Sequence, residues 1–153
     1  MKLHKSVQIC VVVFLLLLTI ACSFTAKADY EKALIENLNA YSDAFIAFAG
    51  TMQNVEINSQ KLNDPSWVAD VKSKLEGIKA AGDALGSMQD VPEDYQSVDG
   101  LMKMINQETD VMVSNFTQGL DAQDISLIET ANENMLKIRE YMDDAAAQIE
   151  SMQ

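Results

Sequence analysis

Apolar residues beyond about residue 29 recur at every third or fourth position of the chain. That spacing is typical of amphipathic helices, each of which turns one apolar stripe toward a shared core. Short polar segments separate four such stretches, and the alternation typical of strands is missing over any useful length. The pattern predicts four helices, over about residues 29–62, 65–89, 92–118 and 122–152.

The apolar stripes identify the residues expected in the core. They are, in chain order, Leu34, Leu38, Tyr41, Phe45, Phe48, Met52, Val55 and Leu62, then Trp67, Val71, Leu75, Ile78, Leu85 and Met88, then Val98, Leu101, Ile105, Met112, Phe116 and Leu120, and finally Ile128, Ala131, Met135, Ile138, Met142, Ala145, Ile149 and Met152. Three glycines interrupt the second helix, and each costs about 1 kcal/mol relative to alanine. Gly77, Gly82 and Gly86 either let a neighbouring helix approach closely or leave this helix loose near its end.

The breaks between the helices carry start signals. Asp64 precedes Pro65, which places a capping carboxylate before a residue whose missing N–H costs nothing in the first turn. Val91-Pro92-Glu93-Asp94 begins the third helix with acidic residues, and Asp121 with Asp124 resembles a capping box before the fourth. Connections this short favour antiparallel neighbours. The predicted fold is therefore all-α, an up-down-up-down antiparallel four-helix bundle.

A different pattern precedes the bundle. Lys2 and Lys5 make the start of the chain positively charged, and an almost unbroken apolar run follows from Val7 to Ala21. This combination is typical of a secretory signal peptide, whereas a membrane span needs about 20 apolar residues. We expect a leader that is removed from a four-helix bundle over residues 29–153, with an uncleaved N-terminal anchor as the alternative.

Two cleavage sites compete after the apolar run. Leu18-Thr19-Ile20-Ala21-Cys22-Ser23 resembles the lipobox of bacterial lipoproteins, which implies a signal peptide over residues 1–21, a lipid on Cys22 and a short tether over residues 22–28. Ala26-Lys27-Ala28 offers the pattern of an ordinary signal peptidase, which would cut after Ala28 and discard the cysteine. The first site anchors the protein to the cell membrane or envelope and is the favoured prediction. The second releases a soluble periplasmic or secreted domain.

Removal of the leader makes the chain more acidic. The full chain of 153 residues has 11 Lys and Arg against 23 Asp and Glu, a net charge of −12. Loss of Lys2 and Lys5 leaves 9 basic residues against 23 acidic ones, a net charge of −14. A surface this acidic repels nucleic acid and anionic lipid headgroups. We therefore expect no nucleic-acid partner, and contact with a membrane only through the lipid on Cys22.

The predicted mature domain lacks the side chains that most catalytic and metal sites need. The single histidine, His4, lies in the leader, and no cysteine pair remains after either cut. Nucleophilic triads, zinc sites, the di-iron pairs of ferritin-like bundles and the haem ligands of bundle cytochromes require these residues. We expect no catalytic residues, no cofactor, no metal site and no disulfide.

Two further metal hypotheses and one ligand hypothesis remain. Thioethers bind Cu(I), but Met102 and Met104 would point about 200° apart on a helix. The acidic clusters at residues 90–94 and 143–144 lack the spacing of a calcium-binding loop and are expected on a solvated surface. Four aromatic residues are expected at one end of the core or, alternatively, along a groove for a hydrophobic ligand or peptide: Tyr41, Phe45, Phe48 and Trp67.

The chain as a whole resembles the small exported four-helix bundles of bacteria, many of them lipoproteins, that mostly lack an assigned function. The lipobox-like segment at 18–23 and the helix starts at 64–67, 91–95 and 121–125 carry the resemblance. It implies a fold, an exported location and Cys22 as the one functional residue. The leading prediction is a non-enzymatic envelope lipoprotein that contacts another, unknown envelope protein. The alternative is a periplasmic or extracellular carrier of a small apolar ligand within the bundle.

Overall fold

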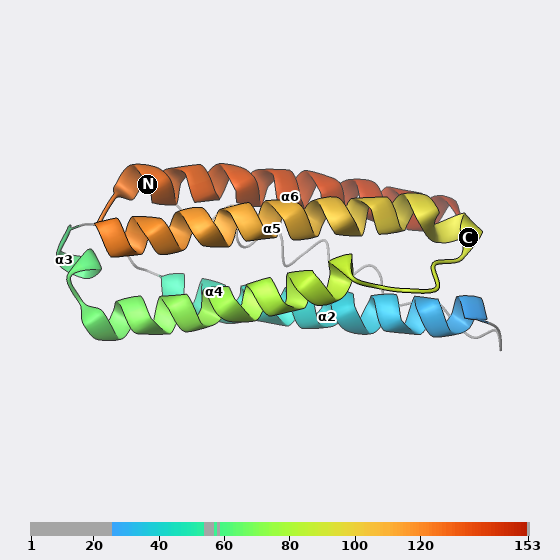
Figure 1. Cartoon of the computed structure of the whole chain (residues 1–153), viewed down its shortest axis with the longest axis horizontal. Coiled ribbons are helices and arrows are strands. Elements are labelled where there is room, and N and C mark those ends of the chain that lie inside the picture. Colours follow the sequence, from blue (N-terminus) through green and yellow to red (C-terminus); the bar gives the residue numbers. More distant parts are fainter. Residues whose placement is uncertain (1–25, 54–56, 58, 153) are drawn as a thin grey trace.

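The computed structural model describes residues 26–53, 57 and 59–152, and these residues are almost entirely helical (Figure 1). The helices are, in chain order, α2 (Ala26–Met52), α3 (Ser59–Leu62), α4 (Pro65–Gly86), the short 3-10 helix η2 (Glu93–Tyr95), α5 (Gln96–Ala122) and α6 (Ile125–Ser151). No strand occurs in these ranges. The predicted all-α class is therefore confirmed for them.

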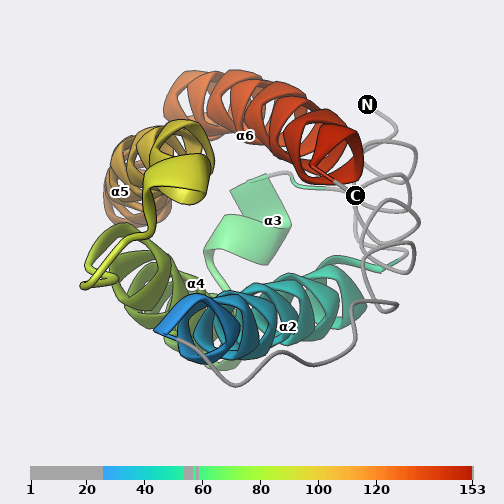
Figure 2. The same cartoon turned by 90° about the vertical axis from the view of Figure 1, so that its right-hand side faces the viewer.

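The four long helices pack side by side in chain order. α2 packs against α4, α4 against α5, and α5 against α6, and Figure 2 shows the four curving around a common interior. Lys27 near the start of α2 bonds Asp94 just before α5 at 3.0 Å, whereas Thr51 near the end of α2 donates to Asp70 in α4 at 2.9 Å. The turn between α4 and α5 lies at one end of the molecule, and the turn between α5 and α6 lies at the other (Figure 1).

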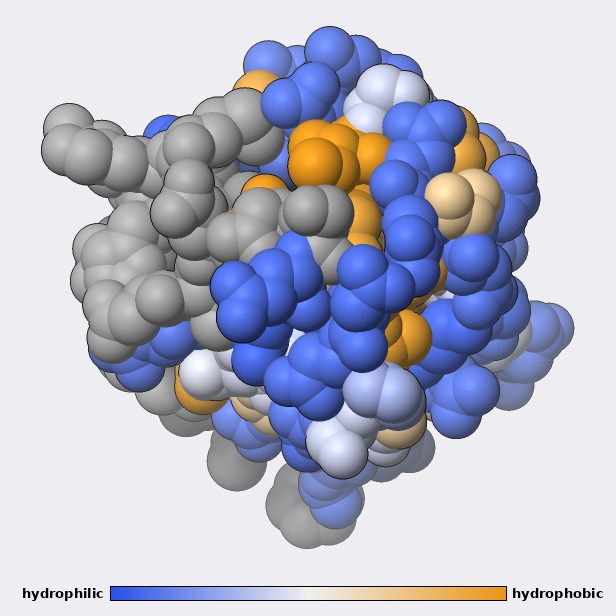
Figure 3. Space-filling view, turned by 90° about the vertical axis from the view of Figure 1, so that its left-hand side faces the viewer, coloured by the Kyte–Doolittle hydropathy of each residue, from blue (hydrophilic) through white to orange (hydrophobic). Residues whose placement is uncertain are grey.

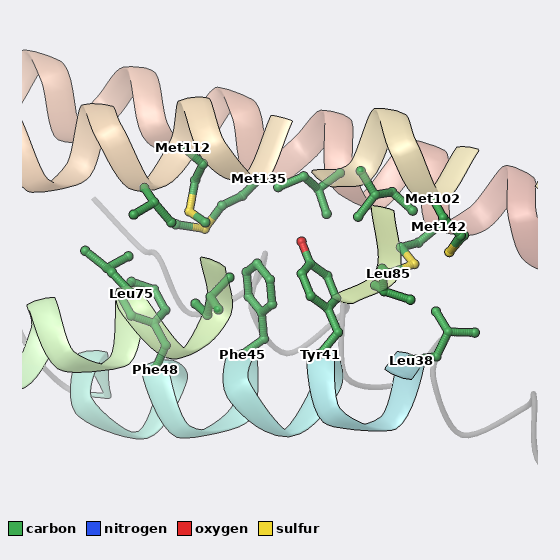
Figure 4. Packing of buried hydrophobic residues seen from close by; sticks show 14 of the residues in the cluster. Leu38, Tyr41, Phe45, Phe48, Leu75, Leu85, Met102, Met112, Met135 and Met142 are labelled. Atoms are coloured by element: carbon green, nitrogen blue, oxygen red, sulfur yellow. The ribbon is translucent and has the colours of Figure 1, made fainter. Parts of the chain in front are cut away.

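The predicted apolar stripes form the core of this bundle. Every expected core residue among those described is buried, except Leu101 and Met152, which are half-buried. Val55 lies outside the described residues. In Figure 4, aromatic side chains of α2 reach into the interior that methionines of α5 and α6 enter from the opposite side. Each large apolar side chain buried in this way contributes about 1.5–3 kcal/mol, so the shared interior stabilises all four helices.

The first helical stretch differs from the single helix predicted over about 29–62. α2 ends at Met52, and Ser59–Leu62 form the separate helix α3. α2 also begins at Ala26, inside the expected tether over 22–28. Gly50 weakens the last turn of α2, because glycine costs about 1 kcal/mol in a helix. Leu62 is still buried in the core. The apolar spacing therefore continues from α2 into α3, and for this reason the spacing alone did not predict that the helix ends at Met52.

The start of α4 confirms its predicted cap. Asp64 accepts hydrogen bonds from the backbone N–H groups of Ser66 and Trp67, both at 3.2 Å, and Pro65 occupies the first helical position. Lys61 of α3 lies 3.0 Å from the same carboxylate. The hydrogen bond from Lys61, followed by those from the backbone, lowers the pKa of Asp64. These bonds tie α3 to the first turn of α4.

The turn between α5 and α6 also differs from its prediction. α5 continues to Ala122 rather than ending near residue 118. Gln123 ends it in the left-handed conformation, with φ of 55°. Asp124, not Asp121, caps α6 by accepting a hydrogen bond at 2.9 Å from the backbone N–H two residues further on. Asp121 and Asp124 have the three-residue spacing of a capping box. That spacing alone did not show which of the two caps α6.

The buried face of α5 is shifted by one residue near its start. Leu101, expected in the core, is half-buried, whereas its neighbour Met102 is fully buried. The same face buries two polar residues, Asp99 and Thr109. Because the buried face of α5 includes polar residues, the positions of its apolar residues do not define that face completely. The prediction from the sequence therefore assigned the wrong residue to the core here.

Two of the three glycines of α4 let α5 approach closely. A Cβ at Gly82 would lie 3.1 Å from Thr109 Cγ2, and a Cβ at Gly86 would lie 2.7 Å from Asn106 Cβ. Nothing lies within 4 Å of a Cβ built at Gly77. Close helix packing therefore explains Gly82 and Gly86, but not Gly77.

Replacing Gly86 with alanine is expected to destabilise the protein by about 1–3 kcal/mol, because the new methyl group would overlap Asn106. Gly77→Ala is the matched control and is expected to stabilise it by about 0.5–1 kcal/mol, since alanine favours a helix interior and the site is open. Denaturation by urea measures both effects. Stabilisation by Gly86→Ala would contradict the close contact between α4 and α5.

Candidate functional site

The lipidation site predicted from the sequence, Cys22, lies outside the described residues. The apolar leader lies outside them as well, and the alternative cleavage point after Ala28 falls in the first turn of α2. Within the described ranges, no helix combines the length and the apolar character that crossing a bilayer requires. The lipid on Cys22 therefore stays a prediction.

Several of the groups considered as metal ligands in the sequence lie apart or have other partners. Met102 is buried, whereas 40% of Met104 is exposed, so the two thioethers do not converge. Asp94 pairs with Lys27, and Asp143 lies in α6 on an exposed face. Among the residues that the structure describes, no three His, Cys, Asp or Glu side chains are grouped so as to hold a metal ion.

The aromatic residues considered in the sequence are buried in the core: Tyr41, Phe45, Phe48 and Trp67. The rings of Tyr41 and Phe45 meet edge-on at 5.0 Å, and Phe48 meets Phe116 of α5 at 5.5 Å. The Tyr41 hydroxyl points across the interior (Figure 4) and shares a buried hydrogen bond with Thr109 of α5. These contacts join α2 to α5 across the core.

An open groove lies between the first turns of α2 and the end of α4. Its volume is about 650 Å³, which falls within the range of about 300–1,000 Å³ found for ligand sites. α2 supplies Asp29, Tyr30, Ala33 and Asn37, and Ala84 with residues 87–90 complete the lining. Figure 2 faces the end of the molecule where α2 begins and α4 ends. We refer to this feature as the α2–α4 groove.

The α2–α4 groove combines apolar surface with two carboxylates. Ala33, Ala84 and Met88 supply the apolar surface, whereas Asp29 and Asp90 are exposed. Neither carboxylate has an ion pair or a hydrogen bond within the described part of the chain. Asp90 adopts a left-handed backbone with φ of 55°, a conformation that aspartate tolerates better than most residues. The groove therefore presents negative charge that no described basic side chain neutralises, beside apolar surface.

Tyr30 connects the groove to buried polar groups behind it. Its ring packs 5.3 Å from that of Tyr95, and only 4% of the residue is exposed. The Tyr30 hydroxyl and Oδ1 of Asp99 are both buried, and neither has a hydrogen-bond partner among the described protein groups. Lys103 donates to the other oxygen of Asp99 at 2.7 Å. Burial, and secondly the charge of Asp99, raise the pKa of Tyr30 to about 12.

Tyr95 fixes the start of α2 against η2. Its hydroxyl donates a hydrogen bond to Glu31 at 2.8 Å, and Lys27 lies 5.6 Å from the centre of its ring. Burial, followed by the bond to Glu31, raises the pKa of Tyr95. The hydrogen bond between Lys27 and Asp94 raises the pKa of Lys27. These contacts hold one wall of the groove in place.

Ion pairs distribute the charges of the surface unevenly. Each lysine and arginine in the described ranges forms an ion pair with a carboxylate. Two of these pairs, Lys72 with Asp121 and Lys79 with Asp110, join α4 to α5. Many carboxylates have no such partner, and Figure 3 shows hydrophilic residues over most of the coloured surface at one end of the molecule. The uncompensated acidic groups give the surface a negative potential.

Sequence reasoning missed the α2–α4 groove and the polar cluster behind it. One signal for Tyr30 was present, because it stands four residues before Leu34 and extends the apolar stripe of α2 by one step. No family model, curated protein or solved structure matches this chain. The candidate site is therefore defined by the geometry and charge of the chain itself.

Alkaline pH is expected to destabilise the fold through Tyr30. Its raised pKa favours the protonated folded state, so this stabilisation is complete below about pH 10 and is lost as the pH rises toward about 12. Tyr30→Phe should therefore lose less stability over this range than the unmodified protein, as measured by urea denaturation at each pH. Tyr141→Phe, at a half-buried position, is the control. Equal losses in Tyr30→Phe and the unmodified protein would contradict this role.

Proposed function

We propose that this protein is exported, is anchored to a membrane by a lipid on Cys22, and acts without catalysis through contacts with another protein of the cell envelope. The positively charged start, the apolar run that ends at Ala21 and the lipobox-like segment support export and anchoring. Lipoprotein modification attaches more than one acyl chain, and stable anchoring requires more than one such signal.

The α2–α4 groove is the observation that supports a contact with a partner protein. It is open to solvent, and it places the apolar surface of Ala33, Ala84 and Met88 beside two exposed carboxylates. A protein interface combines an apolar centre with a polar rim that orients the partner. The groove has this composition, whereas the aromatic residues of the core are occupied by contacts with one another.

The up-down-up-down order of the helices belongs to the same proposal. It is supported by the turns at opposite ends of the molecule and by the contact between Lys27 and Asp94, which joins the start of α2 to the segment before α5. Cys22 precedes Ala26, the first residue of α2, by four residues, a span of about 14 Å at most. A lipid on Cys22 would therefore hold the groove close to the membrane surface and within reach of a membrane-bound partner.

A carrier of a small apolar ligand within the bundle is the second candidate function. Flexible methionine side chains adapt to ligands of different shape, and four of them are buried in the interior shown in Figure 4: Met102, Met112, Met135 and Met142. Native mass spectrometry of the protein purified from its host tests this candidate. A bound apolar molecule would support it, and the mass of the processed polypeptide alone in every preparation would remove it.

Replacing Cys22 with serine tests the anchor. We expect the unmodified protein to partition into membranes with a mature mass that includes the lipid, and Cys22→Ser to lose both properties, because serine does not accept the thioether-linked lipid. Cys10→Ser lies within the apolar run and is the matched control, with unchanged mass and partitioning. An unchanged mature mass and membrane partitioning in Cys22→Ser would show that the anchor is not on this residue.

Site-specific photo-crosslinking in intact cells tests the contact with a partner. The reactive residue is placed at Ala84 in the groove and, in separate variants, at exposed positions of the other helices such as Glu133 of α6. The proposal expects at least one position to give the same protein adduct reproducibly at native expression. Absence of a specific adduct from every face of the bundle would contradict the proposed function.

A further inference from the structure

We propose that the α2–α4 groove binds a basic segment of the partner protein, with a lysine or arginine of that segment at the carboxylates of Asp29 and Asp90. This inference rests on the proposed function and specifies the chemistry of the partner. A basic segment fits this place because the groove carries two negative charges that no described cation of this chain neutralises.

The distribution of ion pairs supports a cation from outside the chain. Lys27, the basic residue nearest to Asp29 in sequence, is held by Asp94 at 3.0 Å and lies over the ring of Tyr95. The other described basic residues are likewise paired with carboxylates. A cation of the partner would therefore meet no competition at Asp29 and Asp90 from the basic residues that the structure describes. The net negative charge of the protein would also accelerate its approach.

The apolar lining fits the rest of such a side chain. Lysine and arginine cover apolar surface with their aliphatic stems while the charged group stays at the polar edge. Ala33 and Ala84 leave room for a stem, and the 9% of Met88 that is exposed adds to the apolar lining. Asn37 adds an amide to the lining, which suits the main chain of a bound segment. An acidic or purely apolar segment would leave both carboxylates without a partner.

The walls of the groove are fixed before any partner arrives. Tyr30 is buried against Tyr95, and the hydroxyl of Tyr95 bonds Glu31 one residue further along α2. The end of α4 packs closely against α5, since a Cβ at Gly86 would lie 2.7 Å from Asn106 Cβ. A site that is ordered in advance loses less conformational entropy on binding. The carboxylates of Asp29 and Asp90 are exposed and take part in none of these contacts. Replacing them is therefore expected to leave the walls of the groove in place.

Binding of a defined peptide tests the proposal. The processed protein is purified in a non-ionic detergent and titrated with a labelled peptide of repeated Lys-Ala-Ala units, with the Glu-Ala-Ala peptide and spermidine as comparison probes. We expect the lysine peptide to bind, its affinity to fall with salt, and the side-chain amide signals of Asn37 and Gln89 to shift in NMR spectra. The glutamate peptide should not bind.

A pair of double variants with the same change of charge locates the site. Asp29→Asn/Asp90→Asn removes the two groove carboxylates, and asparagine tolerates the left-handed backbone at position 90. Glu133→Gln/Asp144→Asn removes two exposed carboxylates of α6 that also lack ion pairs. We expect the groove variant to bind the lysine peptide about five- to tenfold more weakly and the control variant less than about twofold more weakly. Thermal unfolding checks that both variants keep the fold.

Three results would overturn the inference. They are equal weakening by the two double variants, no weakening by the groove variant, and binding of spermidine as tightly as the lysine peptide, which would identify a site for small cations. The proposed function is judged separately by the crosslinking experiment. A reproducible partner adduct from another face, together with an unaffected groove variant, would leave the proposed function standing and remove only this inference.

Discussion

Burial of four apolar stripes in one shared interior is the constraint on which the structure depends. The only cysteines, Cys10 and Cys22, lie before α2, so no disulfide holds the described helices together and packing must do so. Each helix offers a single stripe, and the stripe of α2 meets α5 through Phe48 and through the hydrogen bond of Tyr41. A polar bond at the centre of the core also favours one arrangement of the helices, since a buried unpaired hydroxyl is costly.

The surface follows from the same constraint. Because the stripes take the apolar residues inward, the outer faces carry the charges. The described basic residues form ion pairs with carboxylates, while acidic groups remain in excess. The α2–α4 groove arises where α4 ends and the chain turns toward η2. There the close contact of Gly86 with α5 and the left-handed backbone of Asp90 direct the turn beside the first residues of α2. Local packing thus places apolar surface and free carboxylates together.

The sequence predicted the helices and most of the core because both depend on local periodicity and caps. Asp64 and Pro65 identified the start of α4 correctly, but Asp124 rather than Asp121 caps α6, since the choice depends on how α5 ends. The apolar periodicity also continues past the end of α2 at Met52, so it did not predict that end.

The candidate site could not be predicted from the sequence. Tyr30 and Asp99 lie 69 positions apart in the numbering and meet only in the folded bundle, so neither spacing nor composition indicates their proximity.

Native-state hydrogen exchange of the processed protein tests most directly whether the four long helices share one core. The account predicts that the slowest amides of α2, α4, α5 and α6 exchange with one common free energy, equal to that of global unfolding, because no helix keeps its apolar stripe buried without the others. Exchange of the central amides of α2 through a separate, lower-energy opening, while the other three helices stay protected, would contradict it.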